Sequence, residues 1–512
     1  MAGGLGGTIM QRIAAWALAV LLAGSSAWAQ SPPTPAQVIA MVNDAFKAVQ
    51  DKDEATAARL LKQAVQADAF QQLTPEAQYL TQRVLAGVAY DTDDYQTSAR
   101  AARAACDYPK ADEDDWSIRV WAALATQDHL DAVTGMTVLA TRWPAKLADF
   151  ELRVMGETVY GVDDVAGGEE LQAKLLQALL AAHWKPADAP ASAASGLWLK
   201  LLRFDLKWRN AAQAKEVAPL ISDPSDIRQM RQEVLFDAIV AADPERFDLD
   251  KADARSLAEA LKTMNDKPDQ LDPVIRAAIR LYTLDRQTEA LALLDGALER
   301  VNAKGESAFK DRARQLNWLY DTRSRVLLAL GRTDEGIAQL ESGARLAENG
   351  EANVSQIINL ADAYLEQGRF ADALADLGRM DPKNASPYGR MEYEGARACV
   401  YAQLQDAAGL KDSMTFIDAY SGDDVGAKIT TLLCTGDIDA AARYVIAELA
   451  RPERRSAVLA ELQEYAQPAR ATLTPFQRAM LDRYAALRRR EDVLKAVAAF
   501  GRILRFKTLR YG

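Results

Sequence analysis

Residues 357–374 read IINLADAYLEQGRFADAL, and Pro382 follows shortly after them. Apolar residues recur at three- and four-residue spacing on both sides of Gly368, which predicts two amphipathic helices. Gly368 tolerates the left-handed conformation that ends a first helix. Ala361 and Ala373 are small enough for two antiparallel helices to approach closely. The stretch therefore predicts a helical hairpin, and Pro382 marks its exit.

This stretch resembles the tetratricopeptide repeat. The family places a small residue at position eight, an aromatic at eleven, glycine at fifteen, an aromatic at seventeen and a small residue at twenty, and the matching residues are Ala361, Tyr364, Gly368, Phe370 and Ala373. The resemblance, to an exported bacterial type of the family, implies an all-α fold. We expect a right-handed α-solenoid of antiparallel helix pairs, a TPR-like superhelix.

Looser matches to the same frame recur along the chain. They include Ala86, Asp93 and Tyr95, then Val120, Gln127 and His129, then Ala278, Leu281 and Asp285, then Ser324, Leu327 and Gly331, and finally Gly436, Ile438 and Ala441. The separation from Asp285 to Gly331 is 46 residues and from Gly331 to Gly368 it is 37. The family period is about 34 residues. Several helices or loops are therefore expected to be longer than standard.

The repeat frame and the composition together predict six segments. In order these are a secretory signal peptide at 1–29, an N-terminal TPR-like helical array at 37–183, a Pro/Ala-rich linker at 184–197, an irregular helical segment at 198–272, a C-terminal TPR array at 273–450, and C-terminal capping helices with a basic tail at 451–512. Thr474 followed by Pro475 predicts a helix start, because threonine caps helices and proline suits the first helical position.

The N-terminal residues have the layout of a cleavable signal. Arg12 is the lone charge ahead of an apolar run at 13–23, and Ala27-Trp28-Ala29 precedes Gln30. Cleavage is expected between Ala29 and Gln30. The run is too short for a membrane anchor. Ser25 stands where a lipobox would place its lipidated cysteine, so we expect an exported, soluble, periplasmic protein without a lipid anchor.

Charge and cysteine content narrow the class of partner. The formal net charge of −11 disfavours nucleic acid as a partner. The three cysteines, Cys106, Cys399 and Cys434, are not a disulfide framework. A bridge between Cys399 and Cys434 is one alternative, because they lie about one repeat apart. Buried, unpaired thiols are the favoured interpretation, since both lie in apolar helical sequence.

No catalytic or cofactor motif is present. The sequence lacks a nucleophile elbow, a Walker A loop, a dinucleotide fingerprint and H-E-x-x-H. His129 falls at a packing position of a repeat, and His183 is expected to be exposed at a helix end. We therefore expect no catalytic residue, no metal and no cofactor.

Two acidic runs could suggest calcium. Residues 248–259 place carboxylates at the first, third and twelfth positions of an EF-hand-like loop, but Ala252 and Asp253 occupy the fifth and sixth. An Asp-rich helix N-terminus is the favoured interpretation. The run from Asp112 to Asp115 is expected to be a solvated loop ahead of a helix containing Trp116.

In the tetratricopeptide family, the first helix of each repeat lines a concave groove. Positions two, five, nine and twelve would point into it, and they are Trp318, Asp321, Arg325, Leu328, Ser355, Ile358, Asp362 and Leu365. A mixed aromatic, charged and aliphatic lining suits an extended peptide or a partner helix. The alternative for Trp318 is packing against the preceding repeat.

The C-terminal tail is basic in an acidic chain. Residues 488–512 hold eight basic residues against Glu491 and Asp492. One interpretation is docking on an anionic membrane surface, the only membrane contact we consider. The favoured one is a last helix that closes the array against its acidic body.

These observations favour a periplasmic scaffold or adaptor that binds a protein or peptide segment in its concave groove, in cell-envelope assembly or secretion. The alternative is an enzyme or sugar-binding protein that acts on envelope polysaccharide or peptidoglycan and carries a helical superstructure. A pocket with two close carboxylates would favour the enzyme.

Overall fold

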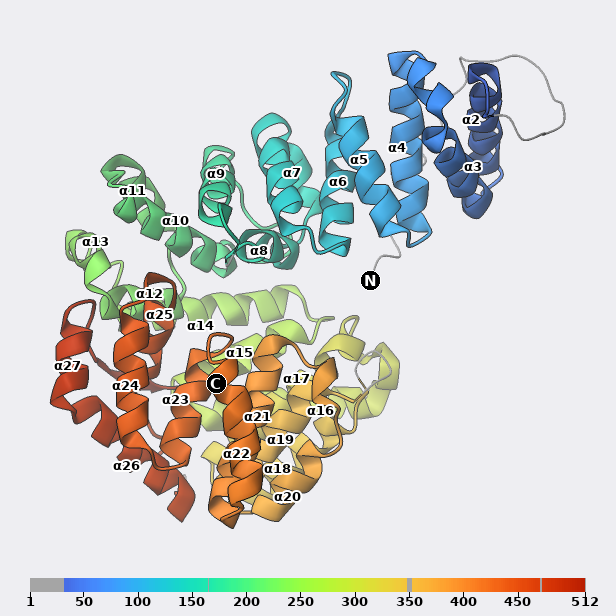
Figure 1. The fold of residues 1–512 in the computed structure, drawn as a ribbon. Helices are drawn as coiled ribbons and strands as arrows, with labels where there is room; N and C mark the ends of the chain where they lie inside the picture. The colour runs from blue at the N-terminus through green and yellow to red at the C-terminus, as the bar shows by residue number, and fades with distance from the viewer. Residues whose placement is uncertain (1–31, 164, 348–351, 470–471, 512) are drawn as a thin grey trace. The chain divides into compact units, whose positions relative to one another are not determined.

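The computed structural model describes residues 32–163, 165–347, 352–469 and 472–511. The predicted signal peptide and its cleavage site lie outside this range. The chain divides into two compact units, Met1–Val217 and Ala218–Gly512 (Figure 1). The predicted linker at 184–197 lies before this division, and in the first unit Trp184 packs on Trp198 with ring centroids 6.4 Å apart.

The first unit is a row of helices. Its α-helices are α2 (Pro35–Gln50), α3 (Glu54–Gln66), α4 (Pro75–Asp91), α5 (Tyr95–Cys106), α6 (Glu113–Ala125), α7 (His129–Arg142), α8 (Leu152–Tyr160), α9 (Gly168–Ala181), α10 (Ser195–Lys207) and α11 (Ala211–Val217). Short 3₁₀ turns are η2 (Asp68–Gln72), η3 (Pro144–Asp149) and η4 (Ala191–Ala194).

The second unit holds the longer array. It runs through η5 (Ala218–Leu220), α12 (Pro224–Gln232), η6 (Val234–Phe236), α13 (Asp237–Ala242), α14 (Leu249–Asp266), α15 (Asp272–Thr283), α16 (Gln287–Lys304), η7 (Gly305–Ala308), α17 (Arg312–Ala329), α18 (Thr333–Ala344), α19 (Val354–Glu366), α20 (Phe370–Leu377), η8 (Pro382–Asn384), α21 (Pro387–Leu404) and α22 (Ala407–Ala419). It continues through α23 (Val425–Cys434), α24 (Ile438–Leu449), α25 (Pro452–Glu461), β1 (Glu464–Ala466), α26 (Pro475–Arg489), α27 (Glu491–Ala498) and β2 (Arg505–Leu509). The prediction of an all-α solenoid is confirmed.

In most helix pairs the turn between the two helices contains one residue in the left-handed backbone conformation. In the 357–374 hairpin Gly368 has φ 73°, and the N–H of Arg369 donates to the carbonyl of Tyr364 at 2.8 Å, which closes the end of α19. The equivalent turns are centred on Lys52, Asp93, Gln127, His183, Arg209, Asp285, Gly331, Gln405 and Gly436, all with positive φ. Only three of these ten positions are glycine, which explains why the sequence signal for the repeat is weak outside one hairpin.

Small residues let α19 and α20 approach each other closely in their hairpin. Ala361 and Ala373 are fully buried at the helix contact, and Tyr364 is buried beside them. Phe370 is partly buried and meets Phe476 of α26 edge-on, with centroids 6.4 Å apart. Thr474 caps α26 as its sequence predicts.

Neighbouring pairs in the first unit are joined by ion pairs at helix starts. Lys62 of α3 contacts Asp94, the N-cap of α5, at 2.6 Å, and Arg103 of α5 contacts Asp128, the N-cap of α7. The same carboxylates accept N–H bonds from their own helices, so each aspartate both caps one helix and ties it to the previous pair.

In the second unit the first helices of successive pairs, α15, α17, α19, α21 and α23, lie against one another. The partner helices α16, α18, α20, α22 and α24 each pack on their own first helix, and α16, α18 and α20 also contact the next one. The first helices therefore form the inner layer of the array. This layer carries the candidate site.

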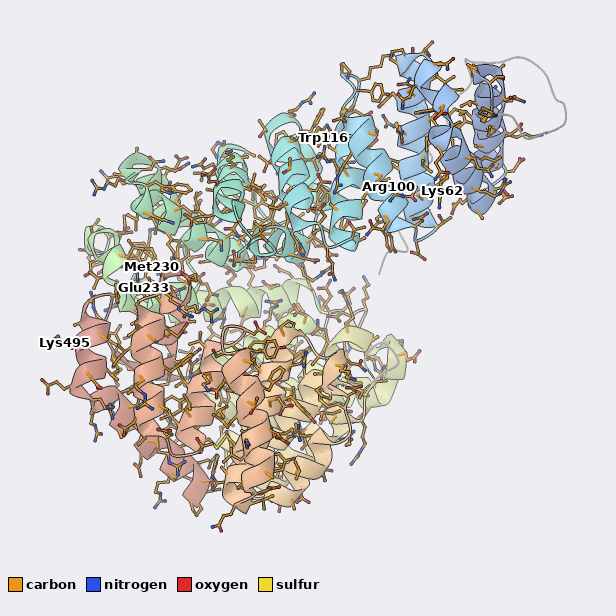
Figure 2. The ribbon with its side chains drawn as sticks, viewed as in Figure 1. Lys62, Arg100, Trp116, Met230, Glu233 and Lys495 are labelled. Carbon is orange, nitrogen blue, oxygen red and sulfur yellow. A yellow bond between two sulfur atoms is a disulfide. The ribbon has the colours of Figure 1, made fainter. Side chains whose placement is uncertain are left out.

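The second unit closes on itself. The N–H of Arg502 donates to the carbonyl of Gln232 at 2.9 Å, and the N–H of Val234 donates to the carbonyl of Phe500 at 3.0 Å. Between them Glu233 and Gly501 form an antiparallel bridge. Glu233, labelled in Figure 2, also accepts a hydrogen bond from Ser456 of α25, and Figure 1 shows α12 beside α25. The beginning and the end of the unit are thus joined.

The prediction that the chain ends in a helix is wrong. After α27 the chain extends, and β2 pairs in parallel with β1, with Glu464 opposite Arg505 and Ala466 opposite Leu509. The reason is that β1 offers backbone hydrogen-bonding groups that a short helix could not satisfy.

The favoured interpretation of Cys399 and Cys434 as free thiols is also wrong. They form a disulfide between α21 and α23, with Cα atoms 5.5 Å apart. The side-by-side packing of these two first helices brings the cysteines together. Cys106 is free, and burial raises the pKa of its thiol to about 12.

The two acidic runs are helix N-termini. Asp248 caps α14, and Asp253 pairs with Arg228 at 3.2 Å, as the favoured interpretation of that run holds. The run at 112–115 is not a solvated loop. Asp112 caps α6, and Asp115 is 2% exposed and accepts a hydrogen bond from Tyr79 at 2.7 Å, because the α4–α6 contact buries it. Within the described ranges no group of three His, Cys, Asp or Glu residues is placed to hold a metal.

Both histidines lie at helix ends. His129 begins α7 and lies against Gly161, where an added Cβ would come within 2.4 Å of the histidine Nδ1. His183 is exposed in the left-handed turn after α9. None of the described helices is long and apolar enough to cross a membrane.

The disulfide gives a first prediction. The purified mature protein, unfolded in denaturant without reductant, should react with one equivalent of maleimide, at Cys106, because the other two cysteines are bonded to each other. After reduction it should react with three. Intact-mass measurement reads both numbers. Three reactive thiols before reduction in protein isolated from an oxidising compartment would contradict the bridge.

The closure gives a second prediction. Gly501→Ala should lower the free energy of unfolding by about 1–3 kcal/mol, because its Cβ would lie 2.4 Å from the Gln232 carbonyl oxygen, a backbone atom. The control is Gly296→Ala in α16, where an added Cβ meets nothing within 4 Å, and it should stabilise by about 0.5–1 kcal/mol. Urea unfolding measures both. Equal effects from the two variants would show that the junction does not limit stability.

Candidate functional site

A row of charged side chains crosses the inner layer of the second unit. We call it the inner-face row, and its members are Arg325 of α17, Asp362 and Glu366 of α19, Glu392 of α21, Asp424 ahead of α23, and Glu461 of α25. Helices α17, α19, α21 and α25 and the N-cap of α23 thus each contribute at least one member.

The members of this row act on one another electrostatically. The carboxyl of Glu392 is influenced by the carboxyls of Asp424 and Asp362. Arg325 interacts with both Asp362 and Glu366. Tyr388, one turn before Glu392, is 59% exposed and interacts with Asp424 and Glu461. The row is therefore one connected, largely acidic surface.

Crowding of carboxyl groups changes their protonation. Burial, and then the negative charge of Glu366, raise the pKa of Asp362 to about 7 although Arg325 acts in the opposite direction. Burial, and then the nearby carboxyls of Asp424 and Asp362, raise the pKa of Glu392 to about 8. Near neutral pH these groups hold protons that a cationic ligand could replace.

At one end of the row lies a site for a tyrosine side chain, which we call the tyrosine seat. It consists of Tyr282 of α15 and of Asp321, Thr322 and Arg325 of α17. The Tyr511 hydroxyl lies 2.9 Å from Thr322 Oγ1 and donates to Asp321 Oδ2 at 3.4 Å. The Tyr282 ring meets the Tyr511 ring edge-on at 5.6 Å, and the Arg325 guanidinium lies 5.2 Å from it.

Asp321 holds the seat in place. It is 1% exposed and accepts hydrogen bonds from Arg325 Nε at 3.0 Å and from Asn359 Nδ2 at 2.9 Å. A buried carboxylate with these partners is fixed in direction, so its second lone pair on Oδ2 points to a defined place. Burial also raises the pKa of the Tyr511 phenol, which therefore stays a hydrogen-bond donor.

The segment that ends in the seat, residues 505–511, lies extended along the unit. Phe506 is buried against Tyr465, with centroids 5.2 Å apart, and under Arg228. Arg510 contacts Glu461 of the inner-face row at 2.5 Å. Lys507 pairs with Asp250 of α14 at 2.9 Å. Each basic side chain named here meets an acidic partner on a helix.

The predicted groove residues are distributed unevenly. Asp321 and Arg325 lie in the tyrosine seat, and Asp362 lies in the row. Ser355 is exposed and Trp318 is 38% exposed. The binding role of these five residues stays a prediction.

Three other predicted groove residues point elsewhere. Ile358 and Leu365 are core residues of the hairpin, buried among the contacts of α19. Leu328 packs toward α18, because a Cβ on Gly336 would lie 2.9 Å from its Cγ. These three side chains pack on neighbouring helices, so we leave them out of the candidate site, and their role in the groove stays a prediction.

The sequence analysis did not predict seven members of the row and the seat: Tyr282, Thr322, Glu366, Glu392, Asp424, Glu461 and Tyr511. All but Tyr511 have no local signal, because only the packing of the helices brings them together. Tyr511 could have been found, since Arg505-Phe506-Lys507 alternates charged and apolar residues as a half-buried strand does.

Comparison with known proteins gives no close relative. No protein-family model matches the chain, and no curated protein matches it. Among solved structures, the chain is similar at 11% identity to a Rap protein complexed with competence and sporulation factor, with a TM-score of 0.30 over 88% of this chain and 99% of that one. It is similar at 12% identity to a circular tandem repeat protein with novel repeat topology, with a TM-score of 0.14 over 90% of each chain. Neither likeness is close enough to assign a family or a ligand.

The raised pKa of Glu392 gives a third prediction. Between the ordinary value of 4.5 and about 8, the folded chain holds a proton at Glu392 that the unfolded chain has lost, so its stability falls as pH rises through this window. Glu392→Gln removes this penalty. Its melting temperature should exceed that of the wild type at pH 8.5, by roughly 2–4 °C for each kcal/mol recovered, and match it near pH 4.5.

Differential scanning calorimetry at the two pH values measures this effect. Glu299→Gln on the exposed side of α16 is the matched control and should not change the pH dependence. A difference between Glu392→Gln and the wild type that is the same at both pH values would contradict the assignment.

Proposed function

We propose that this chain is an exported scaffold or adaptor whose second unit holds a basic, extended segment of a partner protein on its inner face. The observation that carries the proposal is that an extended segment, residues 505–511, already lies there. It reaches the first helices α15 and α17 through Tyr511 and α25 through Arg510. The inner layer thus has the geometry to hold extended chain.

Charge supports the same partner class. Beyond residues 505–511, the row continues over Asp362, Glu392 and Asp424, where carboxyl groups crowd one another. Lysine or arginine from a partner would relieve this repulsion and replace the shared protons, so a basic segment is favoured over an acidic one. The exposed Tyr388 beside Glu392 offers an aromatic surface for the same segment.

The signal sequence supports the location. A cleavable signal without a lipobox cysteine directs a protein to the periplasm as a soluble chain. The Cys399–Cys434 disulfide fits an oxidising compartment, where such bonds persist. Participation in an envelope assembly or secretion machine is part of the proposal and follows from the compartment.

The paired carboxyls do not favour an envelope glycosidase. Glycosidases hold their two carboxyl groups about 5 Å or more apart so that the sugar or water fits between them. Glu392 and Asp424 instead lie close enough for the Asp424 carboxyl to raise the pKa of Glu392. Their arrangement suits recognition of a cation better than acid–base cleavage of a sugar.

Photo-crosslinking tests the proposal. With p-benzoylphenylalanine in place of Tyr388, the native envelope should yield adducts whose crosslinked peptides are rich in Lys and Arg. Adding Glu392→Lys should reduce their yield about tenfold, which corresponds to about 1.4 kcal/mol of lost binding. Mass spectrometry identifies the peptides.

The matched control carries the crosslinker at Tyr420, which is also exposed but ends the outer helix α22. It should not yield the same adducts. Adducts at Tyr388 that persist unchanged in the Glu392→Lys variant would contradict a role for the acidic row.

A further inference from the structure

We propose that residues 505–511 are a resident ligand of the second unit that can detach from it. This segment of the chain occupies the place that a segment of a partner protein would take. Tyr511 is the side chain that the tyrosine seat recognises. This inference deepens the proposed function and rests on it for the identity of the partner class, a basic extended segment with an aromatic phenol.

The first argument is that the segment follows a firm anchor. Residues 500–502 are fixed by backbone hydrogen bonds to Gln232 and Val234 and by the Arg502–Asp237 ion pair at 2.7 Å. The N–H of Leu504 donates to Gln463 Oε1 at 2.7 Å. Undocking of residues 505–511 therefore leaves the closure of the unit intact.

The second argument is that the backbone of the segment is weakly held, so that its docking depends on a few side chains. Its backbone pairs with a single three-residue strand, in parallel and with an irregular register between Glu464 and Ala466. Two-stranded pairs are marginal on their own, and parallel pairing is the weaker kind. The Lys507–Asp250 ion pair is largely exposed on both sides, so it adds little.

The third argument is that the resident fits imperfectly. Thr508 is buried, and its hydroxyl oxygen has no hydrogen-bond partner among the described residues. A buried hydroxyl without a partner opposes docking, because it gives up its bonds to water. A partner segment with an apolar residue at this place would dock better than the resident does.

The fourth argument is that the seat is built for a phenol. Thr322 and Asp321 meet the hydroxyl, and Tyr282 and Arg325 meet the ring. A phenylalanine would leave the buried Asp321 without one of its donors, so the seat discriminates on the hydroxyl group. The selected class is therefore an extended segment in which basic and apolar residues alternate and a tyrosine follows.

The test uses a fluorescein-labelled peptide of residues 502–512, RILRFKTLRYG, and the full mature chain. Fluorescence anisotropy should show that a chain ending after Leu504 binds this peptide at least tenfold more tightly than the wild type, whose site is mostly occupied. The peptide with Tyr511→Phe should bind the shortened chain about tenfold more weakly. A scrambled peptide of equal charge should bind more weakly still. Equal affinity for the scrambled peptide, or no binding by the folded shortened chain, overturns the proposal.

Two point variants of the full chain keep the test valid if the shortened chain does not fold. Tyr511→Ala should loosen the resident and increase the affinity for the peptide several-fold. Thr508→Val removes the unpaired hydroxyl at constant shape, so it should hold the resident more firmly and decrease the affinity. The two variants must shift the affinity in opposite directions, and shifts in the same direction or none overturn the proposal.

The outcomes also separate this inference from the proposed function. If the two tail variants shift the peptide affinity in opposite directions but no charge-dependent adduct forms at Tyr388, residues 505–511 are a resident ligand and the proposed partner is wrong. If adducts form at Tyr388 but the tail variants do not change the peptide affinity, the partner is supported and the resident ligand is wrong. A concentration-dependent dimer that disappears in the shortened chain would assign the face to a second copy and overturn docking within one chain.

Discussion

The second unit depends on the backbone hydrogen bonds between residues 232–234 and 500–502. An open solenoid exposes both ends of its core and tolerates relative movement along its length, because each repeat contacts only its neighbours. Here the end of the chain bonds to α12, more than 260 residues earlier in sequence. The inner layer is therefore closed at its two ends, and side chains on α17, α19, α21 and α25 are held at fixed distances from one another. The contacts between neighbouring first helices bring the members of the inner-face row together.

Closure also explains why the row can hold like charges together. Carboxyl groups in contact repel one another unless they share protons or cations, and the free energy for holding them together must come from packing elsewhere. The first helices supply it through buried contacts and through the Cys399–Cys434 bridge between α21 and α23. A rigid site that holds like charges close together is a candidate binding site, because a ligand of opposite charge relieves the repulsion between them. The basic segment 505–511 recovers part of it at Glu461 and at the tyrosine seat.

The sequence predicted local structure well where one residue type dictates the backbone. Gly368, Thr474 and Asp248 act through their own backbone and nearest neighbours, so the helix ends that they mark are readable from a few residues. The prediction was poorer at the other turns, because Lys52, Gln127 and Gln405 adopt the left-handed conformation without being glycine. Their conformation is imposed by the packing of the two helices that they join. The sequence also does not reveal how a helix is rotated about its axis, so the packing of Leu328, Ile358 and Leu365 on neighbouring helices was not predicted.

What the sequence by itself determined is the class of the fold, its helical hairpin and the helix caps, because all of these follow from short-range periodicity and local chemistry. Only the tertiary structure decided the disulfide, the strand at 505–509, the acidic row and the tyrosine seat. Each of these joins residues from separate helices, and the seat joins Asp321 to Tyr511 across 190 positions. Their formation depends on how the array curves and closes. Many helix contacts together set that curvature, so no local pattern in the sequence predicts it.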